Sequence, residues 1–231
     1  MASNSHGNDN EKDLQKAIDG KCTNELNDNL KSFINFIAEK EGIQINETTK
    51  IMAVNVGGNY KSDINLSILD NTYGISVKTG SGNSIHQEKS SEFVNFIKNE
   101  LNASSNICDN FIWFIDSIDD ASTLKKENPA KINELRSFVD QNRNALSNRF
   151  LRTGLNTSNF VDYVYYGTPS NGIWGRIDEI FELIENTESS TRGALKMGPL
   201  GLQAWNRTNE KKRYTLQVKW TSIENDLKSL N

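Results

Sequence analysis

Three polar residues, Asp63, Ser76 and Lys78, lie in two segments in which apolar and polar side chains alternate. In residues 63–69 every second side chain is apolar, which places Asp63 on the polar face of a predicted strand. Ser76 and Lys78 are two positions apart in residues 75–78, so they share a face of the next strand. The turn sequence DNTYG between the segments predicts a hairpin that brings Asp63 opposite Lys78. A carboxylate and an ammonium group held together are suited to metal-assisted hydrolysis of a phosphodiester, which needs a bound cation and stabilised phosphate charge.

Apolar periodicity predicts the order helix, three strands, helix, strand around this hairpin. The predicted helices are residues 25–40 and 91–101, and the strands are 51–56, 63–69, 75–78 and the continuous apolar run 111–115, which is typical of a strand covered on both faces. For the second half, the pattern predicts helices at 129–151 and 175–185, strands at 160–166, 200–207 and 214–220, and final helical turns at 222–230. Trp220 is predicted to be a core aromatic residue.

The run YKSDINLSILDNTYGISVKTGSGNSIHQE, together with this order of elements, resembles the core of the PD-(D/E)XK nucleases, the restriction-endonuclease-like superfamily. The resemblance covers residues 25–118. It implies a mixed α/β fold with a central mixed β-sheet flanked by helices and an elaborated C-terminal half. The expected organisation is a polar, frayed terminus over residues 1–20, a catalytic core over 21–128, and an extension of the same domain over 129–231, with helices and a basic β-hairpin for DNA.

The resemblance also implies roles for individual residues. Asp63 would bind Mg²⁺, with Mn²⁺ as a substitute, and the main-chain carbonyl of Val77 would be a further metal ligand. Lys78 would orient the attacking water or stabilise the transition state. Ser76 stands where this family usually has an acid, and a serine is a poor ligand for a hard cation.

Either the site is inactive, therefore, or a carboxylate comes from elsewhere in the chain. Glu88, expected at the start of the helix after the hairpin, is the first choice as catalytic and metal-binding acid, with Gln87 beside it. Glu39 on the first predicted helix is a possible additional ligand, and Glu41 is the fallback.

The net charge of −4 hides an uneven distribution, because residues 189–220 carry seven Lys or Arg and a single acid. This asymmetry favours a basic surface for a polyanion. Glutamine, arginine and lysine side chains can contact base edges and phosphates, and the residues predicted to do so in the C-terminal strands are Gln203, Arg207, Arg213, Gln217 and Lys219. Ser81 and Asn83, in the glycine-rich loop TGSGNS, are predicted to approach a DNA phosphate. His86 is expected to be a DNA or structural contact. The loop lacks the Lys-Ser/Thr ending of a P-loop, so no nucleotide cofactor is expected.

No apolar run approaches the roughly 20 residues that span a bilayer, and Cys22 and Cys108 are predicted to be reduced thiols of a cytoplasmic protein. The resemblance therefore implies a Mg²⁺-dependent endonuclease for double-stranded DNA, a type II restriction enzyme, and that function in turn predicts a homodimer, since cutting both strands usually takes two sites. Two alternatives stay open. One is a structure-specific nuclease or resolvase, and the other is a non-catalytic DNA-binding module in which Ser76 marks a decayed metal site.

Overall fold

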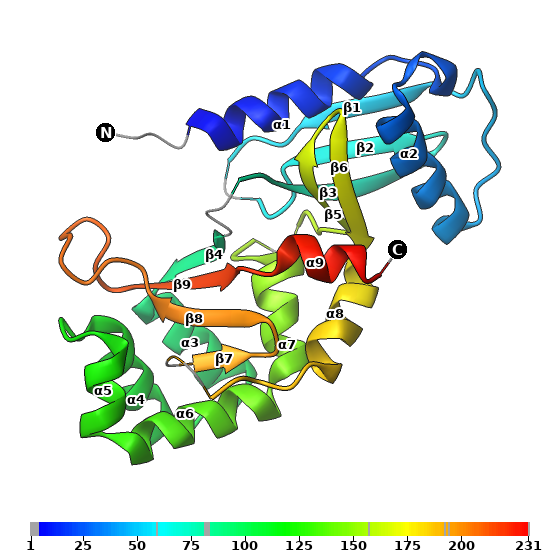
Figure 1. The fold of residues 1–231 in the computed structure, drawn as a ribbon. Helices are drawn as coiled ribbons and strands as arrows, with labels where there is room; N and C mark the ends of the chain where they lie inside the picture. Colours follow the sequence, from blue (N-terminus) through cyan, green and yellow to red (C-terminus); the bar gives the residue numbers. More distant parts are fainter. Residues whose placement is uncertain are drawn as a thin grey trace. The chain divides into compact units, whose positions relative to one another are not determined.

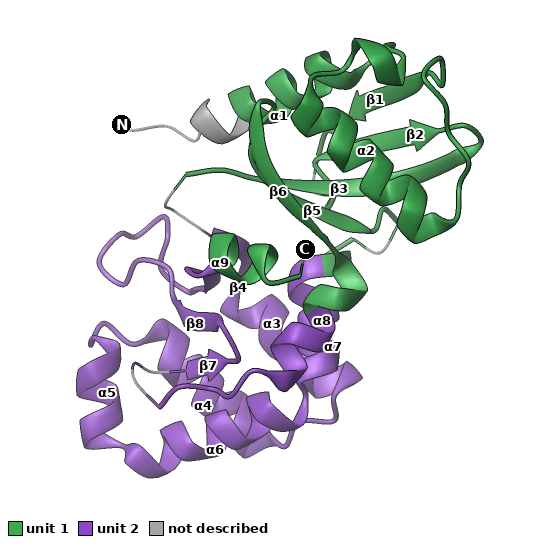
Figure 2. Ribbon diagram, turned by 45° about the vertical axis from the view of Figure 1, so that its right-hand side comes forward, with its two compact units in different colours: residues 1–81, 152–180, 223–231 green, residues 82–151, 181–222 purple. Residues whose placement is uncertain are grey.

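The computed structural model describes residues 5–58, 60–80, 84–156, 158–191, 193 and 195–230. The chain forms two compact units, each made from separate stretches of sequence (Figure 2). Unit 1 comprises residues 1–81, 152–180 and 223–231, and unit 2 comprises residues 82–151 and 181–222. The boundary expected between residues 128 and 129 does not coincide with this division, because both of its sides lie in unit 2.

Unit 1 is built on a mixed five-stranded sheet in the order β1-β2-β3-β5-β6. Its strands are β1 (Ile51–Asn55), β2 (Ile64–Ile68), β3 (Asn71–Lys78), β5 (Tyr163–Thr168) and β6 (Asn171–Arg176). Strand β3 pairs antiparallel with β2 and parallel with β5, so it is the middle strand of the sheet. The predicted three-strand meander and the predicted strand near 160–166 are confirmed, whereas β6 was not predicted.

Helices α1 (Ser5–Ile18) and α2 (Asp28–Glu41) pack on this sheet, with the short 3-10 turn η1 (Thr23–Glu25) between them and α9 (Ile223–Lys228) beside β6 (Figure 1). Helix α2 begins at Asn27, whose side chain accepts a hydrogen bond from the Leu30 N–H at 2.9 Å. It ends at Gly42, which has a φ of 66°. Its buried face includes Phe33 and Ile37, which belong to the same core as the inner side chains of the sheet.

The prediction of a frayed N-terminus is wrong for Ser5–Ile18, which forms α1. Leu14 and Ile18 are each 1% exposed and lie in the core of unit 1. The Gln15 amide donates to the carbonyl of Ala53 at 2.9 Å, and the Asp19 carboxylate accepts from the N–H of Ala53 at 3.0 Å. The polar sequence is therefore helical because a narrow apolar stripe and two polar contacts fix it to β1.

Unit 2 contains a four-stranded antiparallel sheet in the order β4-β9-β8-β7. Its strands are β4 (Ser84–Lys89), β9 (Thr215–Trp220), β8 (Leu200–Ala204) and β7 (Leu195–Met197). Helices α3 (Ser90–Glu100), α4 (Ser105–Asp116) and α6 (Pro129–Gln141) pack against the sheet, and α5 (Ala121–Glu127) packs on α6 (Figure 1). After α6 come α7 (Arg143–Ser147), the π-helical turn Asn148–Thr153 and, later in the chain, α8 (Ile177–Asn186); the last two cross the division, because residues 152–180 belong to unit 1. Trp220 is fully buried, as predicted.

The prediction of a strand at residues 111–115 is wrong, because this run lies within helix α4. Phe111, Phe114 and Ile115 are buried at helical spacing, whereas Ile112 is 39% exposed. Ser104 caps the helix by accepting a hydrogen bond from the N–H of Ile107 at 3.3 Å. A helix with three closely spaced core contacts thus produces the continuous apolar run that also characterises a buried strand.

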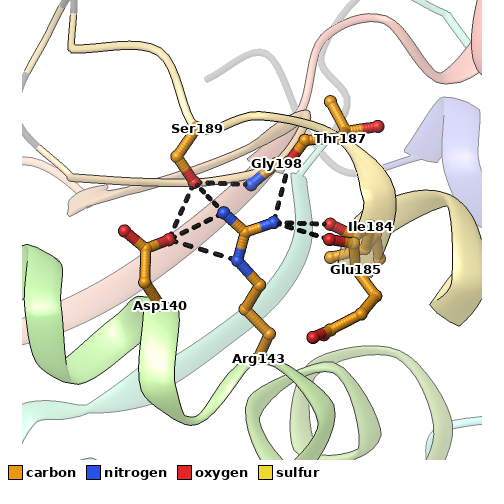
Figure 3. A network of polar contacts seen from close by, with 7 residues as sticks. All are labelled: Asp140, Arg143, Ile184, Glu185, Thr187, Ser189 and Gly198. Carbon is orange, nitrogen blue, oxygen red and sulfur yellow. Dashed lines mark hydrogen bonds and ion pairs between the residues drawn. The ribbon is translucent and has the colours of Figure 1, made fainter.

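Arg143 joins α7 to the C-terminal end of α8 (Figure 3). Its Nη1 donates to the carbonyls of Ile184, Glu185 and Thr187 at 2.9, 3.1 and 2.7 Å. Its Nη2 donates to Ser189 Oγ and to the Asp140 carboxylate, both at 2.8 Å. The last carbonyls of a helix have no partner within the helix, and this one guanidinium supplies a donor to two of those at the end of α8, Ile184 and Glu185.

Candidate active site

Asp63 and Lys78 meet at the ends of two paired strands of unit 1. Asp63 directly precedes β2, and its N–H donates to the carbonyl of Ile75 at 2.8 Å, which fixes its register against β3. Lys78 is the last residue of β3, and its Nζ lies 3.0 Å from Asp63 Oδ2. The side chain of Asp63 is 21% exposed, and that of Lys78 is 22% exposed. The hairpin therefore brings the predicted carboxylate and ammonium group together and leaves both partly exposed.

Two further groups hold the Asp63 carboxylate in place. The N–H of Val77 donates to Asp63 Oδ2 at 2.6 Å, and the buried Ser76 hydroxyl donates to the same atom at 3.2 Å. Lys78 Nζ also donates to the carbonyl of Val77 at 2.9 Å. Within the described residues, no hydrogen bond engages Asp63 Oδ1. Ser76 therefore orients the aspartate, and the predicted metal ligand Val77 presents its carbonyl to Lys78.

Glu11, on helix α1, is a second carboxylate near this pair. Burial raises the pKa of Glu11, the negative charge of Asp63 raises it further, and the positive charges of Lys78 and Lys12 lower it. The charges of Asp63 and Lys78 act on Glu11 because α1 packs against the sheet that carries both. This part of unit 1 therefore holds two carboxylates, Asp63 and Glu11, together with the positive charges of Lys78 and Lys12.

The sequence prediction missed Glu11 because it treated residues 1–20 as frayed. The signal for a helix is present in the sequence, since Leu14, Ala17 and Ile18 are apolar at spacings of three and four. Glu11 lies one turn before Leu14, close to the buried stripe of that helix.

Glu88, the acid expected to complete the metal site, lies in a different setting. It is in strand β4 of unit 2 and not on the helix that follows, so its predicted position is corrected. Its side chain is 0% exposed, with Oε2 at 2.8 Å from Arg149 and Oε1 at 2.9 Å from His86. Burial by itself raises the pKa of Glu88, but the hydrogen bonds and charges of His86 and Arg149 outweigh it and hold that pKa below its usual range. Both carboxylate oxygens are therefore taken by protein partners.

The other residues proposed around Glu88 are also placed. His86 is 7% exposed and packs on the ring of Phe150 at 5.2 Å, as a structural contact would. Gln87 is exposed, and its amide donates to Ser84 Oγ at 3.0 Å.

The two acids at the end of α2 differ from each other in their contacts. Glu39 is exposed. Glu41 accepts a hydrogen bond from the Tyr163 hydroxyl at 2.5 Å and lies 3.6 Å from Arg176. Burial and the neighbouring Glu41 raise the pKa of Tyr163, so this hydroxyl stays protonated and continues to donate.

The oxygen atoms at Asp63 and Glu11 fit a magnesium ion better than they fit a zinc ion. Within the described residues, no group of three or more His, Cys, Asp and Glu side chains is arranged to hold a metal. Mg²⁺ does not need such a group, because it is usually bound through one or two carboxylates, with water and substrate phosphate completing its shell. The two carboxylates and the carbonyl of Val77 are hard oxygen donors of the required kind.

Apart from His86, described above, the residues predicted to contact DNA fall into three groups. Ser81 and Asn83 lie outside the described residues. Gln203, Gln217 and Lys219 lie in the paired strands β8 and β9 of unit 2.

Arg207 and Arg213 are in the segment that connects β8 and β9. Arg207 donates to the carbonyl of Ser117 at 2.7 Å and stacks on Phe114, with 5.5 Å from its Cζ to the ring centre. Burial lowers the pKa of Arg207, and the carboxylates of Asp120 and Asp119 raise it. Arg213 lies 4.8 Å from the ring centre of Tyr214. The structure thus gives Arg207 a role in anchoring this segment to the end of α4.

Comparison with known proteins identifies the fold. No protein-family model matches the sequence, and no curated protein matches it. Among solved structures, the chain is similar to the crystal structure of restriction endonuclease MspI in complex with its cognate DNA, with 14% identity and a TM-score of 0.57. The similarity covers 95% of this chain and 93% of that one. The protein therefore has the restriction-endonuclease-like fold, with a mixed central sheet flanked by helices. In the described part of the chain, no helix has both the length and the apolar character needed to cross a membrane.

Proposed function

We propose that this protein is a Mg²⁺-dependent endonuclease that hydrolyses phosphodiester bonds of double-stranded DNA. The observation that carries the proposal is the pairing of Asp63 with Lys78 at the ends of β2 and β3, in a fold shared with a restriction endonuclease. That neighbour was solved with its cognate DNA, which supports DNA as the substrate. In detail, we propose a sequence-specific type II restriction enzyme that acts as a homodimer, because symmetric cutting of two strands calls for two equivalent sites.

In this proposal Asp63, Glu11 and the carbonyl of Val77 would hold Mg²⁺, or Mn²⁺ in its place. The cation would supply Lewis-acid chemistry, polarising the scissile phosphate and activating the attacking water. Lys78 directs its ammonium group at the phosphate, where it stabilises the charge that develops on the phosphoryl oxygens. Donors from Ser76 and Val77 keep Asp63 in one orientation through Oδ2, which would leave Oδ1 to serve as the metal ligand.

Glu11 replaces Glu88 as the second acid of the proposed centre. The carboxylate of Glu88 is fully buried and has both oxygens bound by His86 and Arg149. Burial and the negative charge of Asp63 raise the pKa of Glu11. Glu11 and Asp63 would together hold a cation without giving up an ion pair of Glu11 among the described residues, whereas Glu88 would have to give up its contacts with His86 and Arg149.

The test is cleavage of plasmid DNA with Mg²⁺ by the full chain and by Asp63→Ala, Lys78→Ala and Glu11→Gln. We expect each variant to lose about 100-fold or more of the rate, the scale seen when a group that stabilises transition-state charge is removed. Matched controls are Asp70→Ala and Lys50→Ala, an exposed acid and an exposed lysine of the same unit. Cleavage at the wild-type rate by the Asp63 and Lys78 variants would refute the proposed mechanism.

A second candidate function rests on Ser76, which gives the centre one acid fewer than the family pattern. In that case the protein binds DNA without cutting it, and calorimetry finds no binding of Mg²⁺ or Mn²⁺ beside intact DNA binding. If cutting does occur, the cleavage products distinguish a restriction enzyme from a structure-specific nuclease. Discrete fragments from linear duplex DNA indicate a restriction enzyme, and cutting confined to junctions or flaps indicates a structure-specific nuclease.

A further inference from the structure

The four-stranded sheet of unit 2 has one apolar face and one polar face. The apolar face carries Met197, Leu202, Val218 and Trp220, each at most 1% exposed, and helices α3, α4 and α6 pack against the sheet. Six longer polar side chains lie on the opposite face, which we call the lysine–glutamine face: Lys89, Lys196, Lys219, Gln87, Gln203 and Gln217. We propose that this face binds the duplex DNA substrate, an inference that rests on the proposed function and names its docking surface.

The strand register sorts these side chains into rows across the sheet. Lys196 is opposite Gly201, and Gly201 is opposite Lys219, so two lysines from β7 and β9 flank a position without a side chain. A Cβ added at Gly201 would lie 3.1 Å from Lys196 Nζ, which shows that the lysine side chain extends over the glycine. Gln203 is opposite Gln217, and Gln217 is opposite Gln87, which forms a row of three amides next to the lysines.

The charge of this face is positive and is not balanced within it. Among the residues that the structure describes, none of Lys89, Lys196 and Lys219 forms an ion pair. Lys89 Nζ donates to the neutral hydroxyl of Thr215 at 3.3 Å. The acid of strand β4, Glu88, points to the other face, where Arg149 and His86 bind it. In a chain with a net charge of −4, a sheet face that carries three lysines and no acid is suited to an anionic partner.

The glutamine row is ordered by its own hydrogen bonds. Gln203 Nε2 donates to Gln217 Oε1 at 3.0 Å, and Gln217 Nε2 donates to Ser84 Oγ at 3.0 Å. Gln217 is 5% exposed with both amide atoms engaged, so it is a positioning residue and not the base contact expected from the sequence. In the described structure, the side-chain oxygens of Gln203 and Gln87 accept no hydrogen bond, which leaves each amide able to accept as well as donate.

These features favour duplex DNA over an acidic protein as the partner. The cores of protein interfaces are depleted in lysine and enriched in aromatic residues, whereas this face combines lysines with ordered planar amides. Strands can enter the major groove, where a glutamine amide pairs with the N6 and N7 edge of adenine and a lysine contacts phosphate. The lysines therefore contribute affinity, and Gln203 and Gln87 contribute sequence preference.

The test measures binding of a labelled DNA duplex of mixed sequence without Mg²⁺, so that cleavage does not interfere. The triple variant Lys89→Ala, Lys196→Ala and Lys219→Ala is compared with the wild type over a range of salt concentrations. We expect weaker binding and a plot of log K against log salt that is shallower by about one per lysine removed. The matched control removes three exposed lysines elsewhere, with Lys50→Ala, Lys98→Ala and Lys126→Ala combined, and keeps the wild-type slope.

A second measurement separates reading of bases from binding of phosphates. We expect Gln203→Ala to keep the salt slope but to lower the preference for selected over random duplexes by roughly 5- to 100-fold. Equal slopes for the wild type and the triple lysine variant, or a wild type that does not bind duplex DNA, overturn the inference. Cleavage of plasmid DNA by the wild type with Mg²⁺ is measured separately. Cleavage without a change of salt slope would keep the nuclease proposal and reject this docking surface, and a changed slope without cleavage would do the opposite.

Discussion

Replacing Glu88 by glutamine distinguishes a structural ion pair from a metal ligand. The substitution keeps the size of the side chain and removes the charge that faces Arg149 at 2.8 Å and His86 at 2.9 Å. If the carboxylate is structural, as its contacts indicate, the protein loses stability and keeps its rate of cleavage per folded molecule. If the carboxylate binds the catalytic metal, the rate falls instead.

The size of the stability loss follows from the burial of the pair. Breaking a fully buried ion pair from one side costs about 3–5 kcal/mol. The lower end applies here, because Arg149 is 14% exposed and keeps its contact with the ring of Phe96, 4.8 Å from its Cζ. For a protein of this length a loss of about 3 kcal/mol lowers the melting temperature by roughly 6–12 °C.

The pH dependence supplies an independent check. Because the pKa of Glu88 is depressed below its ordinary value of 4.5 in the folded protein, its stabilising contribution is complete above that value and is lost as the pH falls through the folded pKa. The difference in free energy of unfolding between the wild type and Glu88→Gln therefore shrinks on acidification below about 4.5.

The assay is thermal unfolding followed by circular dichroism, combined with plasmid cleavage at a temperature where both proteins are folded. Glu88→Gln melts early and cuts normally, whereas Glu11→Gln cuts poorly and melts no earlier than the wild type. If Glu88→Gln instead kept its melting temperature and lost cleavage, the structural role would be refuted. Glu88 would then be assigned as a ligand of the catalytic metal.

Three further outcomes follow from contacts described above. Saturating Mg²⁺, at about 100 times its dissociation constant, stabilises the wild type by roughly 2.7 kcal/mol, and calorimetric scans find no such gain for Glu11→Gln. Arg143→Met removes the donors that bind the last carbonyls of α8 and lowers the free energy of unfolding by about 1–3 kcal/mol in urea titrations; Lys98→Met, an exposed position, leaves it unchanged. Gly74→Ala places a Cβ 1.8 Å from the carbonyl oxygen of Phe160 and costs about 3 kcal/mol or more in the same titrations; an unaffected midpoint would contradict the close packing of β3.

Alternation of apolar side chains was sufficient to predict the hairpin that carries Asp63 and Lys78. Period-two patterns in β2 and β3 determine which residues share a face, and the short turn leaves one register. The mixed sheet and its flanking helices followed from the resemblance and are present in the structure.

The remaining elements depend on contacts that a local pattern does not contain. Helix α4 was predicted to be a strand because Phe111 and its neighbours form a continuous apolar run, and helix α1 was missed because only Leu14, Ala17 and Ile18 mark its buried side. His86 and Glu88 lie in a strand because β4 pairs with β9, more than a hundred residues later in the chain. That long-range pairing also determines that Glu88 meets Arg149, and no local signal in residues 84–92 predicts it.

The parallel pairing of β3 with β5 has a consequence for shortened forms of the protein. Val77 is opposite Tyr165, so a polypeptide that stops before β5 leaves the backbone of β3 without a partner along one side. Residues 74–77 of β3, which are buried in the full-length protein, would become exposed at that edge. Such an open edge recruits other strands, and we expect truncated translation products of this gene to aggregate and to be degraded instead of persisting as partly active fragments.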